Sequence, residues 1–181
     1  MTEVVIREVA ALDAVVAQAA AGDEAAFARL VAEHHASMVR VGYAITGDGE
    51  SAADAVQAAW SIAWRRLGTL RHPGTLRPWL LTIAANEARQ ILRRQRRRPI
   101  VDISAIPEPV GDGDPAERIQ TVDLARVLRS LGPDDRTLLA LRFAAGLDSN
   151  EISTQLGLSP SGVRSRLSRL IERLRKELDH G

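Results

Sequence analysis

Residues 157–160, Gly-Leu-Ser-Pro, limit the fold of this chain more than any other stretch, because they must end one helix and begin another. Glycine adopts the left-handed conformation that commonly ends a helix. Serine followed by proline supplies a capping hydroxyl and then a first helical residue that needs no amide donor. Upstream, Asp148 and Glu151 have the spacing of a capping box. The sequence therefore predicts a helix-turn-helix over residues 148–178.

The helix after this turn has one apolar face and a strongly basic remainder. Its apolar residues recur at spacings of four, three, four and four, which predicts a buried stripe of Val163, Leu167, Leu170, Leu174 and Leu178. Between residues 160 and 176 there are six cations and a single acid, Glu172. A solvated surface helix is the alternative, but such a helix normally mixes both signs. We expect the first turns to enter a DNA major groove, where these residues make contact: Ser161, Arg164, Ser165, Arg166, Arg169 and Arg173.

These DNA contacts are expected to be of two kinds. Arg166 and Arg169 are placed to read guanine edges through paired hydrogen bonds. Arg164 and Arg173 lie nearer the edges of the helix face and are expected to contact phosphates, which carry no sequence information. Small residues such as Gly162 let the start of the helix approach closely. The helix therefore has the features of a recognition helix.

A second concentration of positive charge ends the first half of the chain. Residues 89–98 contain no acid and six arginines: Arg89, Arg93, Arg94, Arg96, Arg97 and Arg98. Such density repels itself on a structural helix but suits a polyanion. A solvated helix end is the alternative. We expect the first five of these arginines to bind the DNA backbone.

The composition changes abruptly after this run. Residues 99–116 hold four prolines, two glycines and four acids, with no cation. Such a stretch cannot form a helix and is too polar for a core. The alanine- and leucine-rich segments on either side favour helices. The sequence thus predicts an all-α protein with two small helical domains, residues 1–98 and 121–181, joined by an acidic Pro/Gly-rich linker, residues 99–120, about which the domains reorient. The C-terminal domain contains the helix-turn-helix.

Start and stop signals divide these domains into helices. We expect them over residues 9–21, from Asp23, from Ser51, from Pro78, and over residues 121–131 and 133–145. The adjacent histidines His34 and His35 are expected on the surface. Trp60 and Trp64 are one turn apart and are expected in the core, and so is Phe143.

Other chemistry is not indicated. The chain has no cysteine, and its four histidines lack ligand spacing, so we expect no metal and no cofactor. No nucleophile elbow, phosphate-binding loop or buried carboxylate pair is present, which argues against an enzyme. No apolar run approaches the roughly 20 residues of a membrane span, and no secretory signal opens the chain. We expect a cytoplasmic protein without membrane insertion. The net charge of +1 says little about partners.

The order of these parts resembles the extracytoplasmic-function (ECF) group of bacterial RNA polymerase sigma factors, a small class with only the second and fourth sigma regions. In the N-terminal half the resemblance rests on G-D-E-A-A-F-A-R-L from Gly22, D-A-V-Q-A-A-W-S-I-A-W-R from Asp54 and R-P-W-L-L-T-I-A-A-N from Arg77. In the C-terminal half it rests on L-G-P-D-D-R-T-L-L-A-L-R-F-A-A-G-L from Leu131 and E-I-S-T-Q-L-G-L-S-P-S-G-V-R-S-R-L-S-R-L from Glu151. It covers nearly the whole chain.

This resemblance implies a transcription initiation factor that binds core RNA polymerase and directs it to specific promoters. The helix with Asp54 and Gln57 would dock on the β′ clamp helices, and the C-terminal domain would meet the β flap. Residues 70–97 would capture and melt the minus-ten element, with Asn86 at the position of the family's asparagine. The recognition helix from Ser159 would read the minus-thirty-five element of promoter DNA. An anti-sigma factor is a possible further partner.

Four positions depart from the family pattern. Ala58 stands where an acid usually follows the docking glutamine, and Ala55 stands where a bulky aliphatic is usual. Gln90 replaces an aspartate, and Ser153 replaces an alanine. The first two departures concern polymerase docking. Two alternatives therefore stay open: a helix-turn-helix regulator that does not dock on polymerase, and an adaptor whose basic faces bind an acidic partner.

Overall fold

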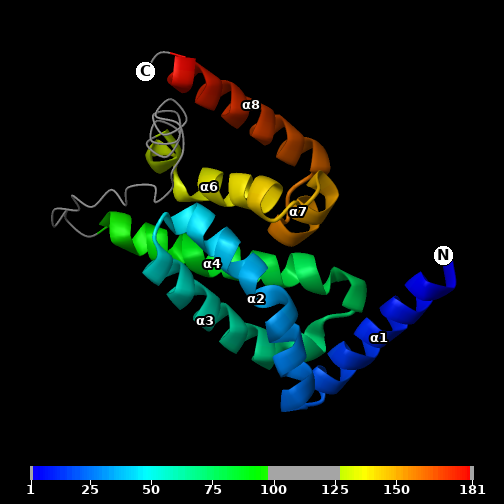
Figure 1. Ribbon diagram of the computed structural model, residues 1–181. Coiled ribbons are helices and arrows are strands. Elements are labelled where there is room, and N and C mark those ends of the chain that lie inside the picture. Colours follow the sequence, from blue (N-terminus) through cyan, green and yellow to red (C-terminus); the bar gives the residue numbers. More distant parts are fainter. Residues whose placement is uncertain (1, 98–126, 180–181) are drawn as a thin grey trace, which may run out of the picture.

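The computed structural model describes residues 2–97 and 127–179, and all regular structure in these two ranges is helical (Figure 1). The N-terminal half contains α1 (Thr2–Ala20), α2 (Glu24–Thr46), α3 (Gly49–Arg66), the 3₁₀ turns η1 (Leu67–Thr69) and η2 (Pro73–Thr75), and α4 (Leu76–Arg97). The C-terminal half contains α6 (Pro133–Leu139), the π-helical turn η3 (Ala140–Ala144), α7 (Ser149–Leu156) and α8 (Pro160–Asp179). The all-α prediction is confirmed. The expected linker, residues 99–120, and Arg98 lie outside the described residues.

Helices α2, α3 and α4 form a three-helix bundle in which each helix packs against the other two. Helix α1 packs across one end of α2, and its N-terminal part projects away from the bundle (Figure 1). The bundle is tight because α3 buries mainly alanines, and these are fully inaccessible: Ala52, Ala55, Ala59 and Ala63. Small side chains let the helix axes approach, while the leucines of α2 and α4 fill the remaining space.

The helix ends follow the capping signals, with shifts of a few residues. The Asp23 carboxylate accepts a hydrogen bond from Ala26 N at 3.0 Å, as expected of an N-cap. Helix α3 begins earlier than expected because Asp48, not Ser51, is its N-cap and accepts from Ser51 N at 2.7 Å. Helix α4 begins at Leu76, which places Pro78 within its first turn, where no amide donor is required.

Three predicted positions are wrong. His34 is buried at 8% exposure, whereas its neighbour His35 is exposed. The reason is that His34 lies four residues after Leu30 and four before Met38, in the stripe of α2 that faces the bundle. Burial, together with the nearby charge of Arg77, lowers the pKa of His34 below its ordinary value, and Glu33 only partly opposes this.

The other two errors concern aromatic residues. Trp64 is 40% exposed and Phe143 is 63% exposed, so neither belongs to the core. Trp60 is half-buried. Both indoles meet the ring of Phe27 edge to face, with centroid distances of 5.6 Å for Trp60 and 4.8 Å for Trp64. Phe27 and Trp60 are partly buried and pack against the core, while Trp64 lies at the surface.

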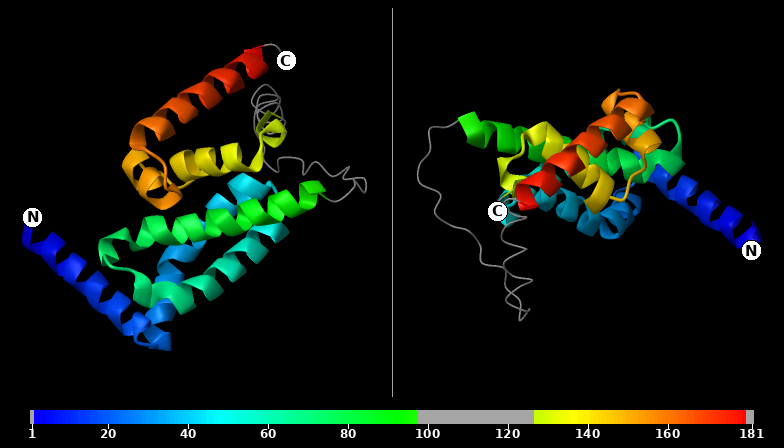
Figure 2. Two further views of the ribbon diagram at one scale, coloured as in Figure 1. Left: turned by 180° about the vertical axis from the view of Figure 1, so that it is seen from behind. Right: turned by 90° about the horizontal axis from the view of Figure 1, so that it is seen from above.

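The two halves are packed together. Helix α6, the turn η3 and helix α7 lie against α4, and α6 and η3 also contact α2. In Figure 1 and in the left view of Figure 2, α6 lies between α4 and α8. Buried residues of both halves belong to one continuous apolar cluster. The change in composition after residue 98 gave no indication that the two halves pack against each other. Whether the halves separate in solution stays a prediction.

Replacing Gly42 with valine should destabilise the bundle by about 1–3 kcal/mol. A Cβ atom at Gly42 would lie 3.3 Å from the backbone oxygen of Ala52, so α2 and α3 would have to move apart. The measurement is urea-induced unfolding followed by circular dichroism. Gly49→Val is the matched control, because a Cβ at Gly49 meets nothing within 4 Å. Equal unfolding midpoints for the two variants would contradict this account of the helix contact.

Candidate nucleic-acid interface

The helix-turn-helix forms as the sequence predicted. Asp148 accepts hydrogen bonds from the amides of Asn150 and Glu151 at 2.7 and 2.8 Å. Glu151 accepts from the Asp148 amide at 2.8 Å, which completes the capping box. Gly157 ends α7 with φ +66°, in the left-handed region. Ser159 then accepts from Gly162 N at 3.0 Å and fixes the start of α8.

Helix α8 presents its basic residues away from the core. Its inner face buries Val163, Leu167 and Leu170, as predicted, but Leu178 is 38% exposed, so the prediction is wrong at this last position. The exposed residues on the outside include these members of the predicted recognition set: Ser161, Arg164, Ser165, Arg169 and Arg173. An exposed basic face over an apolar stripe is the arrangement that a groove-binding helix needs.

Three arginines of α8 have partners within the protein. Arg166 is half-buried, and its Nε and Nη2 atoms donate to Asp135 Oδ1 at 3.1 and 2.7 Å. Arg169 Nε donates to the Ser165 carbonyl at 3.4 Å, along its own helix. Arg173 Nε donates to Glu177 Oε1 at 3.0 Å. Of these three, only Arg166 is engaged by a different helix, so it is the least available to DNA in this conformation.

The arginine run of α4 divides into two faces. Arg89, Arg93 and Arg96 follow one another at spacings of four and three, and they face the C-terminal half. Arg94 and Arg97 are exposed on another side of the helix. Asn86, three residues before Arg89, is half-buried. The run therefore holds an inward group, Arg89, Arg93 and Arg96, and an outward group, Arg94 and Arg97. The prediction from the sequence did not separate them.

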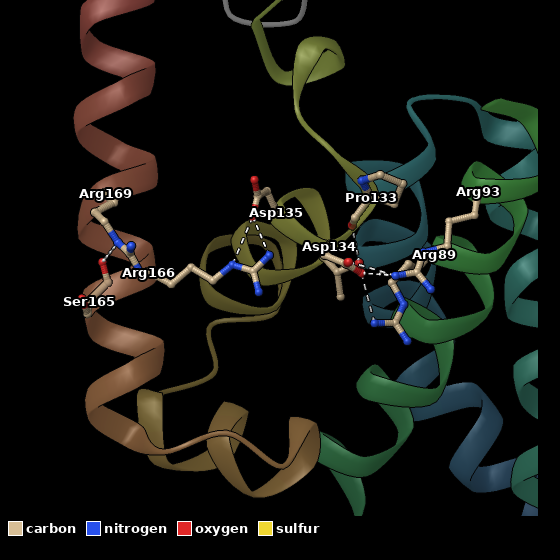
Figure 3. A network of polar contacts seen from close by, with 9 residues as sticks. Arg89, Arg93, Pro133, Asp134, Asp135, Ser165, Arg166 and Arg169 are labelled. Atoms are coloured by element: carbon tan, nitrogen blue, oxygen red, sulfur yellow. Dashed lines mark hydrogen bonds and ion pairs between the residues drawn. The ribbon is translucent and has the colours of Figure 1, made fainter. Parts of the chain in front are cut away.

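The inward group binds the beginning of α6. Arg93 Nη2 donates to both Asp134 oxygens, at 2.7 and 2.9 Å, and Arg89 Nη1 lies 3.3 Å from Oδ1. Arg96 Nη2 donates to the carbonyls of Arg129 and Leu131 at 3.0 and 2.6 Å. Figure 3 shows Asp134 turned toward α4 and the adjacent Asp135 turned toward Arg166 of α8. These two carboxylates thus connect the two predicted DNA-binding groups.

Sequence reasoning assigned no role to Asp134 and Asp135. Both lie in the first turn of α6, where acidic residues are favoured by the helix dipole, so their presence there needs no further explanation. The available signal was their position between two strongly basic segments. Their partners are 31 to 45 residues away in the chain and could not be identified from spacing.

A buried arginine also crosses between the halves. Arg136 is 6% exposed, and its Nη1 donates to the carbonyl of Ile45, near the end of α2, at 3.0 Å. Its Nε is buried without a partner among the described residues. Burial, reinforced by the charges of Arg96 and Arg129, lowers the pKa of Arg136 to about 10, so it remains a cation at neutral pH. In addition, Arg77 of α4 donates to the carbonyl of Ala145.

The predicted docking residues lie on an open face of α3. Asp54 and Gln57 are both exposed, and Trp64 continues the same helical stripe. Ala58 is half-buried beside them. Ala55 is fully buried in the bundle and contributes to packing, so it is not part of this face. Of the two departures in this helix, only Ala58 can change what a partner would meet.

Metal and membrane chemistry find no support in the described residues. Residues 2–97 and 127–179 contain no group of three or more side chains that could hold a metal ion. Within the same part of the chain, no helix combines the length and apolar character that crossing a bilayer requires.

Known proteins share this arrangement. Sigma-70 region 2 matches residues 30–98, and Sigma-70, region 4 matches residues 121–174. The ECF RNA polymerase sigma factor SigL of Mycobacterium tuberculosis is 30% identical over 169 residues, covering 90% of this chain and 94% of SigL. The probable RNA polymerase sigma factor RfaY of Xanthomonas campestris pv. campestris is 35% identical over 172 residues. That match covers 88% of this chain and 42% of RfaY, so the chain spans less than half of that relative.

A solved structure supports the same assignment. CnrH, in its complex with the cytosolic domain of CnrY, superimposes with a TM-score of 0.69 at 27% identity, covering 92% of this chain and 96% of that chain. The similarity therefore extends over both halves and not only over the widespread helix-turn-helix. This chain belongs to the sigma-70 family of RNA polymerase sigma factors, within the ECF group.

Proposed function

We propose that this chain is a transcription initiation factor that binds core RNA polymerase and directs it to specific promoters. The observation that carries the proposal is that one chain holds two separate basic elements in the order of the family. One is α4 with its arginine run, and the other is α8 of the helix-turn-helix. A simple DNA-binding regulator needs only the second. A protein-interaction adaptor needs neither a capped turn nor a recognition helix.

The exposed face of α3 is the proposed contact with the polymerase β′ clamp helices. Asp54 and Gln57 would supply its polar contacts, and Trp64 adds a large aromatic surface of the kind enriched in protein interfaces. With Ala58 in place of an acid, the face is less negative than the family pattern. The C-terminal half would contact the β flap. Because each half would then be held at a different place on the polymerase, the two DNA-binding elements would be spaced along a promoter.

The two basic elements divide promoter recognition between them. The arginines of α4, with Asn86, would hold the minus-ten element as it melts, mainly through the backbone. Helix α8 would read the minus-thirty-five element in the major groove. Exposed Arg169 is the favoured base reader, because Arg166 is engaged by Asp135. Arg164 would grip phosphate.

The cellular setting follows from this role. A factor that associates with bacterial RNA polymerase acts in the cytoplasm, and it needs no catalysis of its own because the polymerase supplies the chemistry. The structure of CnrH was solved with the cytosolic domain of a second protein, CnrY. By analogy, an anti-sigma protein that covers the polymerase- and DNA-binding faces is the proposed regulatory partner.

Replacing Asp54 and Gln57 together by alanine should weaken binding to core RNA polymerase by about tenfold or more, as expected when two polar contacts in an interface are truncated. The measurements are co-elution with core polymerase and the yield of a run-off transcript, which should fall together. Asp13→Ala, an exposed change on α1, is the control and should leave both intact. A double variant that co-elutes and transcribes like the parent would show that docking uses another face.

Replacing Arg94 and Arg97 together by alanine should weaken binding to every DNA sequence alike. If each arginine holds one phosphate, the plot of log affinity against log salt concentration should lose about two units of slope. Both side chains are exposed, so the fold should be unaffected. The measurement is fluorescence anisotropy with a labelled duplex at several salt concentrations. An unchanged slope would mean that these arginines are merely solvated.

Replacing Arg169 by alanine should cost ~1–3 kcal/mol on the preferred promoter duplex and much less on its scrambled version. Arg164→Ala is the matched comparison and should weaken both duplexes equally, because a phosphate contact carries no sequence information. Binding is measured at one fixed salt concentration, after a promoter has been selected with reconstituted holoenzyme. Equal losses of Arg169→Ala on both duplexes would remove Arg169 from the base-reading set.

A further inference from the structure

The beginning of α6 holds arginines from two separate helices. Asp134 receives Arg93 through two short hydrogen bonds and also lies beside Arg89. The next residue, Asp135, receives two donors of Arg166 on one oxygen. The side chains of the two aspartates diverge, one toward α4 and the other toward α8 (Figure 3).

The chemistry of these contacts resembles that of DNA binding. A guanidinium presents its donors in a fixed fork that matches a carboxylate and a phosphate equally well. While Arg93 Nη2 donates to both oxygens of Asp134 and Arg89 Nη1 donates to one of them, these two nitrogens cannot bind phosphate. Asp134 and a DNA backbone are therefore alternative ligands of one group of atoms. In this packed arrangement α6 also lies against the inward side of α4.

These contacts are weak enough to exchange. Side-chain exposure is 46% for Arg93, 29% for Arg89 and 45% for Asp134. Ion pairs as open as these contribute little net stability. The packed arrangement also buries the cation Arg136 with no carboxylate partner among residues 2–97 and 127–179, which opposes it. A polyanion that offers several phosphates at once can compete with such a contact.

We propose that Asp134 acts as an internal substitute for DNA phosphate, occupying Arg89 and Arg93 in the free protein and leaving them when DNA takes its place. Binding of DNA to the inward arginines then requires α6 to leave α4. Because Asp135 ties Arg166 to α6, helix α8 moves with α6 as one body. This inference rests on the proposed role of the α4 arginines in DNA binding.

The test is the affinity of the full-length chain, without polymerase, for a labelled random-sequence duplex, measured by fluorescence anisotropy at one salt concentration of about 0.1 M. Asp134→Asn should tighten binding about two- to fivefold, the equivalent of releasing one exposed ion pair. Asp13→Asn removes the same charge from the exposed surface of α1 and should change affinity by less than about 1.5-fold, because salt screens a distant charge. A gain no larger than that of Asp13→Asn overturns the proposal.

A second background identifies the arginines involved. In a chain carrying Arg89→Ala and Arg93→Ala, Asp134→Asn should no longer tighten binding, because its partners are absent. A gain that persists there overturns the proposal. The double arginine variant also separates this inference from the function on which it rests. If the double arginine variant binds DNA as well as the parent, both with Asp134 and with Asp134→Asn, the assignment of these arginines to DNA is wrong. If the double arginine variant binds more weakly than the parent, but Asp134→Asn gains nothing when the arginines are present, only the competition is wrong.

A second variant guards against a change in folding. Asp134→Ser retains an oxygen near the first amides of α6. If Asp134→Asn unfolds at a lower temperature than the parent, Asp134→Ser should still show the gain in affinity.

A distance measurement tests the movement itself. Because the chain has no cysteine, labels on Gln90→Cys and Ser168→Cys report the distance between α4 and α8 without interference. Energy transfer between them should fall on addition of DNA, and fall further in Asp134→Asn. Transfer that DNA does not change would show that α6 stays on α4, and would overturn the proposal.

Discussion

The seating of α6 on the N-terminal bundle is the contact on which the arrangement of this sigma factor depends. Arg136 reaches the carbonyl of Ile45 near the end of α2, while Asp134 receives Arg89 and Arg93 of α4. One short helix thereby fixes both the position of the C-terminal half and the availability of the arginines beside it. Its polar contacts are partly open and incompletely paired, while Leu138 and Leu139 join the apolar cluster that both halves share.

The alanine core of the bundle has a comparable effect on the opposite side of the molecule. Helix α3 buries alanines, and the rings of Phe27, Trp60 and Trp64 pack together at the edge of this core, where Trp64 is exposed. Trp60 Nε1 also donates to His35 Nδ1 at 3.2 Å, which ties the exposed histidine into the cluster. A rigid aromatic edge therefore lies next to Asp54 and Gln57. The residues of α3 thus contribute both to the packing of the bundle and to the aromatic and polar side chains of the proposed docking face.

The departures from the family pattern gain a physical interpretation from this packing. Ala55 is a core residue, and a larger side chain there would separate α3 from its neighbours unless those neighbours became smaller. Ala58 is half-buried on the docking stripe and changes the charge presented to a partner. Ser153 is buried, and its hydroxyl donates to the Asn150 carbonyl at 2.8 Å, so the polar group is accommodated within the helix-turn-helix.

The sequence by itself determined most features that depend on neighbours a few residues apart. The capping box at Asp148, the left-handed Gly157 and the apolar stripe of α8 are local patterns, and they appear as predicted except for the exposed Leu178. The family order of the two halves was also readable from the sequence. Only the tertiary structure decided which arginines of α4 face inward, because Arg89 and Asp134 are 45 residues apart. Charge density predicts an affinity for anions, but it cannot say whether that anion is DNA or a carboxylate of the same chain.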